Sequence, residues 1–314
     1  MAIDHVLKLY AETIRSPYLH YGYWDEPEKV NADSLSIDDI ADAQGRYIEH
    51  LTSFIPEDVR SILDVGCGVG GNTAYLQERG FDIDVLSPDS YQEEVIKEKF
   101  NGALQFFKSK FENFETDRIY DLILESESAC YIKIEPGFTS ARRALRTSGY
   151  LLVADYFVCY RDERGSPHLK SSHPMKAYLD GAEAAGFKLL KEYDQTENTM
   201  PTLDAAHHFI ERFILPTAEY AQVSLQRKNP LTYRLMKSLF GKNISSKMDQ
   251  LDLVKSEEFR KFTEQTMAET EAGCLTWLIS ALGFPDYEAV VHAYGTVIGT
   301  GNAIVGWDPR QAKV

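Results

Sequence analysis

Glycines and one acid form the segment of this sequence whose types and spacing could do chemistry most directly. The run Asp64-Val65-Gly66-Cys67-Gly68-Val69-Gly70-Gly71-Asn72 follows the short apolar segment 61–65. Glycines between a strand and a helix let a ligand approach the backbone closely. The run also matches the dinucleotide pattern G-x-G-x-x-G, but Asp64 would face the negative pyrophosphate. The acid suits a ligand with an ammonium group instead. The alternative is that the glycines form a structural turn that binds no ligand.

The elements around this loop alternate between strand-like apolar runs and helical periodicity. We expect strands at 61–65, 81–86, 104–107, 120–124, 150–157 and 187–193, and a last strand within the glycine-broken run 293–307. We expect helices between them at 72–78, 90–100, 138–146 and 175–185. Such alternation predicts an α/β protein with a Rossmann-like, doubly wound, mostly parallel seven-stranded sheet.

The pattern divides the chain into four parts. Residues 1–58 are expected to form an N-terminal helical lid, with helices at 2–15 and 38–54, and residues 59–199 the cofactor-binding core. Residues 200–290, with helical patterns at 203–220 and 250–270, are expected to form a helical cap over the acceptor pocket. Residues 291–314 then supply the final strand or strands of the core sheet.

Composition excludes several classes of protein. Lys and Arg total 33 against 48 Asp and Glu, and this net charge of −15 argues against binding to nucleic acid. The four cysteines have no paired spacing, so we expect neither a disulfide framework nor a metal site. Without a signal-like N-terminus or an apolar run of membrane-spanning length, the sequence predicts a cytoplasmic protein with no membrane span.

Several motifs resemble those of class I S-adenosylmethionine-dependent methyltransferases. The D-x-G-x-G-x-G of residues 64–70 resembles motif I, residues 120–123 the fourth-strand motif, and residues 145–151 the turn before strand five. Glu127-Ser128 and the aromatic box 20–24 resemble the small-molecule branches near tocopherol, sterol and natural-product methyltransferases. The resemblance implies S-adenosyl-L-methionine as the cofactor, since it carries an ammonium and a sulfonium but no phosphate.

The resemblance also implies a set of cofactor contacts. These are Tyr21, Tyr23, Trp24, Asp64, Gly66, Cys67, Gly68, Gly70, Asn72, Leu86, Ser87, Phe111, Glu112 and Glu125. The sequence departs from the family at the ribose, because Val85 occupies the usual acidic position and Asp84 should point to the opposite face. Ser87 and nearby backbone are expected to hold the ribose instead. The adenine-side acid is also missing, which leaves Phe111 and Glu112 as the adenine contacts.

Candidate bases for the reaction lie at the carboxyl ends of the strands and on the first cap helix. Asp155 ends strand five and Glu127 follows strand four, on the edge where open α/β sheets bind ligands. His207 and His208 lie early on the cap helix. A carboxylate can orient an imidazole base, so Asp155 with a cap histidine ranks ahead of Glu127.

The function predicted is methyl transfer to a small or medium apolar metabolite, with O-methylation of a hydroxyl ahead of N- or C-methylation. A nicotinamide-dependent oxidoreductase and a non-catalytic binding protein are the rival classes, and Asp64 argues against the first. We expect the protein to bind a small-molecule acceptor and not to bind nucleic acid. The basic residues between 227 and 247 are compatible with an acidic carrier protein as a further partner. A homodimer partner is an equal alternative.

Overall fold

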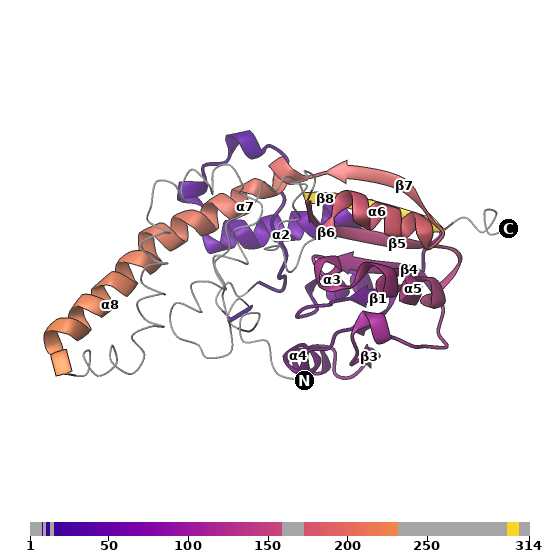
Figure 1. Cartoon of the computed structure of the whole chain (residues 1–314), viewed down its shortest axis with the longest axis horizontal. Helices are drawn as coiled ribbons and strands as arrows, with labels where there is room; N and C mark the ends of the chain where they lie inside the picture. The colour runs from indigo at the N-terminus through magenta and orange to yellow at the C-terminus, as the bar shows by residue number, and fades with distance from the viewer. Residues whose placement is uncertain (1–7, 9–10, 13–15, 159–172, 232–299, 308–314) are drawn as a thin grey trace.

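The computed structural model of the chain describes residues 8, 11–12, 16–158, 173–231 and 300–307, and these residues form a sheet flanked by helices (Figure 1). The strands are β1 (Ser61–Val65), β2 (Asp82–Leu86), β3 (Phe106–Phe107), β4 (Tyr120–Ser126), β5 (Leu145–Val158), β6 (His173–Pro174), β7 (Phe187–Asp194) and β8 (Thr300–Trp307). The α-helices are α2 (Ile37–Thr52), α3 (Gly71–Glu78), α4 (Ser90–Lys99), α5 (Ile134–Ala144), α6 (Met175–Ala184), α7 (Thr196–Phe209) and α8 (Leu215–Lys228). Short 3-10 turns are η1 (Pro27–Lys29), η2 (Ala32–Ser34), η3 (Phe111–Asn113) and η4 (Ala129–Tyr131), and η5 (Ile210–Ile214) is a π-helical turn.

The strand order β3-β2-β1-β4-β5-β8-β7 confirms the doubly wound, mostly parallel sheet. Parallel pairs join β1, β2, β3, β4 and β5, and β6 adds a short parallel pair to β5. The parallel part of the described sheet therefore has six strands rather than seven. Strand β8 lies between β5 and β7 and is antiparallel to both.

Several element boundaries differ from the sequence prediction. Helix α5 begins at Ile134 and ends at Ala144, and β5 begins at Leu145 rather than at residue 150. Leu145 pairs with Tyr120 before the register shifts, and Ser148 adopts a φ of 65° in the turn that follows. The turn that resembles the family motif is therefore present, but backbone pairing carries the strand through it. Helix α7 likewise begins at Thr196, seven residues before the predicted start.

The two faces of the sheet have separate hydrophobic cores. Ile62, Leu122 and Leu152 pack with Tyr47 of α2 and with α3 and α4 on one face. The next residues along the same strands, Leu63, Ile123 and Val153 among them, pack with α5 and α6 on the other face. This period-2 division is expected for strands buried on both sides.

Helix α2 joins the N-terminal segment to β1, and helix α7 continues the chain from β7 toward α8 (Figure 1). Ser36 caps α2 through a capping box with Asp39, and α7, η5 and α8 run on as one long helical segment. Residues 8 and 11–12 are helical, but most of the predicted helix 2–15, all of 250–270 and most of the cap lie outside the described residues. The four-part division of the chain therefore stays a prediction. No helix in the described part of the chain is long and apolar enough to cross a membrane.

Candidate functional site

The glycine loop joins the carboxyl end of β1 to the start of α3. Gly66, Gly68 and Gly70 have φ angles of 76°, 55° and 75°, in the left-handed region that favours glycine. A Cβ atom on Gly66 would lie 2.4 Å from Ser128 Cβ, and one on Gly70 would lie 2.5 Å from Ile96 Cδ1. The sequence pattern and the backbone thus agree that this loop needs glycines.

Asp64 lies beneath this loop and is almost fully buried. Its Oδ2 atom accepts a hydrogen bond of 2.7 Å from Thr73 Oγ1 on α3. Burial raises the pKa of Asp64 to about 6, and the Thr73 hydrogen bond opposes the rise. The acid therefore ties β1 to the first turn of α3, a role that the motif alone does not indicate. Cys67, the next predicted contact, is also buried, and burial raises the pKa of its thiol.

The aromatic box reaches both the glycine loop and the end of β4. His20 Nε2 lies 2.9 Å from Asn72 Oδ1 on α3, and its Nδ1 lies 2.8 Å from the Tyr21 carbonyl oxygen. The Tyr21 amide donates a 2.9 Å hydrogen bond to Glu127 Oε1. Tyr21, Asn72 and Glu127, which sequence reasoning placed separately, thus meet at one edge of the sheet.

Tyr23 and Trp24 anchor the box to other elements of the fold. The Tyr23 hydroxyl lies 3.0 Å from the Tyr193 hydroxyl, and the Trp24 amide donates to the Asn198 carbonyl at 2.9 Å. Both side chains are buried. In this structure they bind the N-terminal segment to β7 and α7, so their predicted contact with a cofactor stays a prediction.

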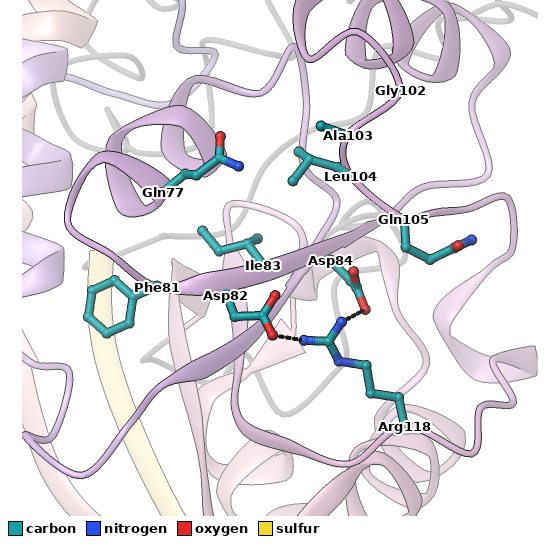
Figure 2. Close-up of a pocket in the computed structure, with 10 residues that line it drawn as sticks. All are labelled: Gln77, Phe81, Asp82, Ile83, Asp84, Gly102, Ala103, Leu104, Gln105 and Arg118. Atoms are coloured by element: carbon teal, nitrogen blue, oxygen red, sulfur yellow. Dashed lines mark hydrogen bonds and ion pairs between the residues drawn. The ribbon is translucent and has the colours of Figure 1, made fainter.

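The end of β2 offers hydroxyl and backbone groups where most of the resembled family has an acid. Leu86 and Ser87 are buried there, and Ser87 Oγ accepts the Asp89 amide at 3.1 Å. Asp84 accepts a 2.7 Å hydrogen bond from Tyr120 Oη and pairs with Arg118 at 2.8 Å. Figure 2 shows this pair beside a cavity of about 400 Å³ that the start of β2 lines. That cavity lies toward the start of β2, whereas the glycine loop lies at the carboxyl end of the neighbouring strand β1. Asp84 is thus paired with Tyr120 and Arg118 and away from the glycine loop.

The predicted adenine contacts lie in η3. Phe111 is almost fully buried and packs near Phe114, with ring centroids 6.3 Å apart. Glu112 Oε1 accepts the Lys133 amide at 3.4 Å. Phe111 thus serves the core of the sheet, and a ligand contact for either residue stays a prediction.

Two buried acids lie on the strands next to the glycine loop. Glu125 of β4 accepts a 3.1 Å hydrogen bond from Tyr178 Oη, and burial raises its pKa to about 8. Asp155 of β5 accepts the backbone amides of Cys130 and Tyr156 at 2.9 and 2.8 Å. Burial raises the pKa of Asp155 to about 7, while these amides oppose the rise.

Of the two predicted histidines, the structure describes the side chain of His208 alone. His208 Nδ1 lies 2.8 Å from Asp33 Oδ1, in a pair that is partly exposed, so its observed carboxylate partner is Asp33 rather than Asp155. His207 is on α7, and its side chain lies outside the described part of the chain. Among the described residues, no group of three or more His, Cys, Asp or Glu is arranged to hold a metal ion.

Sequence reasoning missed several polar residues that shape the site. Ser128 Oγ donates to the Val65 carbonyl at 2.6 Å, and Lys99 Nζ donates to the Gly70 carbonyl at 3.0 Å. Both fix the glycine loop from outside the motif. A Ser directly after Glu127 was a usable signal, whereas Lys99 is an ordinary last-turn lysine of α4 whose reach depends on the tertiary fold.

The buried acids predict an unusual pH dependence of stability. A raised pKa in the folded state means that the folded chain holds its proton more tightly than the unfolded chain does. The stability this contributes is therefore present below the unfolded pKa and is lost as pH rises through the folded pKa. For Asp155 and Glu125 the loss extends to pH 7 and 8. Each pH unit that separates the folded from the unfolded pKa of such a carboxyl corresponds to about 1.4 kcal/mol.

We expect the melting temperature of the ligand-free protein to fall between pH 6.5 and 8. His20, whose pKa burial lowers from 6.5 to about 4, gives the opposite slope below 6.5, so the test uses this upper window. Thermal unfolding followed by circular dichroism is the measurement. Glu125→Gln should flatten the slope, and a melting temperature that rises over this window would contradict the assignment.

Comparison with known proteins agrees with this geometry. Residues 40–192 match the family described as methyltransferase domain, a segment that runs from α2 to β7 and includes the glycine loop. The described residues also fit the cofactor, because the loop is a cradle of left-handed glycines and the nearby side chains Asp64, Glu125 and Asp155 are acids. Residues 40–192 are therefore similar to a methyltransferase domain, and the glycine loop beside these acids fits S-adenosylmethionine as the cofactor.

Individual relatives are distant. The chain is 26% identical to methyltransferase GfsG of Streptomyces halstedii, over 67% of this chain and 80% of that protein. It is 28% identical to phosphoethanolamine N-methyltransferase 3 of Arabidopsis thaliana, over 49% of this chain and 35% of that protein. A 52-residue stretch, 17% of each chain, is 48% identical to the 2-aminophenol 1,6-dioxygenase beta subunit of a Pseudomonas species. The chain thus spans only a minor part of two of these three relatives.

A solved structure agrees in fold. The crystal structure of a sarcosine dimethylglycine methyltransferase from Galdieria sulphuraria, described there as putative, matches with a TM-score of 0.62. The match covers 97% of this chain and 99% of that one at 15% sequence identity. At this identity the likeness supports the fold and leaves the acceptor to be argued from the site.

Proposed function

We propose that the protein transfers a methyl group from S-adenosylmethionine to a hydroxyl of a small or medium apolar metabolite, as a tailoring enzyme of specialised metabolism. The observation that carries the proposal is Asp155, a buried carboxyl at the carboxyl end of β5 whose pKa of about 7 suits proton removal at neutral pH. The cofactor supplies an electrophilic methyl group. The protein supplies alignment, exclusion of water and a base for the hydroxyl proton.

The N-terminal segment supports this assignment. His20 and Tyr21 contact Asn72 and Glu127, so the aromatic box spans from the glycine loop to the end of β4. In our proposal residues 1–58 act as a lid over the cofactor, and residues 200–290 as a cap over the acceptor. A lid of this kind excludes water from the reacting groups.

N-methylation is the second candidate, because a relative acts as a phosphoethanolamine N-methyltransferase. C-methylation needs a carbon nucleophile and is the third. A nicotinamide-dependent oxidoreductase is no longer favoured, since the family match and the buried Asp64 both indicate the other cofactor. The net charge of −15 also disfavours anionic acceptors that approach from bulk solution.

Methyl-labelled S-adenosylmethionine and a panel of acceptors test the proposal. The panel contains γ-tocopherol as a neutral phenol, a neutral secondary alcohol, phosphoethanolamine and dimethylglycine. We expect the label on an oxygen of the neutral acceptors and little on the charged ones. Product analysis by mass spectrometry locates the methyl group. Label found only on nitrogen or carbon would reject O-methylation while leaving the cofactor assignment intact.

A further inference from the structure

Tyr47 lies where the lid, the sheet and α7 meet. It projects from α2 and is 1% exposed. Its ring stacks on His20, with centroids 4.2 Å apart and an angle of 24° between the planes. His20 in turn contacts Asn72 of the glycine-loop helix, so Tyr47 lies one side chain away from the cofactor-binding segment.

The hydroxyl of Tyr47 has an unusual environment for a buried group. Tyr47 Oη and Ser126 Oγ, at the end of β4, are both buried, and neither completes a hydrogen bond of normal geometry within the described residues. The side chains of Gln195 and Ser126 act on Tyr47 as loose hydrogen-bond partners, and both lower its pKa. Buried polar atoms in native proteins nearly always have a partner, which is another protein group, an ordered water or a ligand.

Within the described residues, the charged groups that raise the pKa of this hydroxyl are both acids. Burial, followed by the nearby Glu127 and Asp155 carboxylates, raises the pKa of Tyr47 well above its ordinary value. The phenol is therefore a hydrogen-bond donor at neutral pH, beside a second hydroxyl and an amide. A phosphate or carboxylate at this position would meet two acids and gain no opposite charge from them.

We propose that Tyr47 and Ser126, with the Gln195 amide beside them, form a subsite that hydrogen-bonds an uncharged oxygen, hydroxyl or carbonyl, of the methyl acceptor. This rests on the proposed function, since the subsite lies beside Glu127 and Asp155 at the edge where the transfer is placed. The subsite selects neutral acceptors over phosphorylated ones. The acceptor thus differs in class from the phosphoethanolamine of the plant relative.

Binding of phenol and of phenyl phosphate to the protein loaded with S-adenosylhomocysteine tests the subsite. The two probes share a ring and differ in charge, and neither requires methyl transfer. We expect phenol to bind, phenyl phosphate to bind far more weakly, and Tyr47→Phe to weaken phenol binding about three- to tenfold. Ser126→Ala should weaken it in the same direction. Affinity for S-adenosylhomocysteine should be unchanged in both variants.

Tyr120→Phe is the matched control, because Tyr120 is equally buried but its hydroxyl donates to Asp84 at 2.7 Å. It should lower the melting temperature by about 2 °C or more and keep phenol binding, whereas Tyr47→Phe should not lower the melting temperature. Unchanged phenol affinity in Tyr47→Phe, equal binding of phenyl phosphate, or no phenol binding by the wild type would each overturn the proposal. Methylation of nitrogen in the acceptor panel would reject the proposed function but not this binding comparison.

Discussion

Gly66→Ala is expected to abolish binding of S-adenosylmethionine. The new Cβ would lie 2.4 Å from Ser128 Cβ, and the φ of 76° at this position is strained for any residue with a side chain. Relief requires the glycine loop to move away from the end of β4, where Ser128 donates to the Val65 carbonyl. Because the loop approaches the ligand with its backbone, such a shift removes the contact surface itself.

Titration calorimetry with S-adenosylmethionine and S-adenosylhomocysteine measures the loss. Gly45→Ala is the control, since a Cβ at this helical position in α2 meets no atom within 4 Å and should raise stability by about 1 kcal/mol. Gly68→Ala should have a smaller effect than Gly66→Ala, because its Cβ meets only the flexible end of Leu19 at 3.0 Å. Wild-type affinity in a folded Gly66→Ala protein would show that the cofactor lies elsewhere.

The sheet was predictable from the sequence because its strands are buried on both sides. Such strands are continuous apolar runs, and β1 and β4 begin where the pattern at residues 61 and 120 places them. Strand β3 was harder, since only Phe106 and Phe107 pair with β2. The start of β5 at Leu145 depends on pairing with Tyr120, a contact between distant residues that no local pattern encodes.

The site divides in the same way. The glycine loop and the two acids at the strand ends follow from motif and position alone. Tyr47 did not, because its place on the apolar stripe of α2 makes it resemble a core residue, and only the fold shows that its hydroxyl faces Ser126 and Gln195. Pairing of His208 with Asp33 depends equally on how α7 packs against η2. Side chains that contact a distant helix or strand can therefore be placed only from the three-dimensional structure.

Asp155→Asn is expected to slow single-turnover methyl transfer by about a hundredfold or more while leaving cofactor affinity intact. A base acts in its ionised form, so the wild-type rate should rise with pH up to about 7, the pKa of Asp155, and level off above it. The Asn variant should lose this dependence. Stopped reactions of protein loaded with labelled S-adenosylmethionine, followed across pH 5.5 to 8.5 with an acceptor from the panel, measure both effects.

Two further variants decide whether the effect belongs to the proton or to the fold. Asp155 accepts the amides of Cys130 and Tyr156, so its amide variant also disturbs the turn after β4. Asp84→Asn removes a buried acid in the middle of β2 and controls for that loss of structure. Glu127→Gln tests the other candidate. If Asp155→Asn keeps the wild-type rate and Glu127→Gln loses it, Glu127 is the base. If both keep it and His207→Ala and His208→Ala keep it as well, the enzyme works by aligning its substrates alone or has its base at another residue.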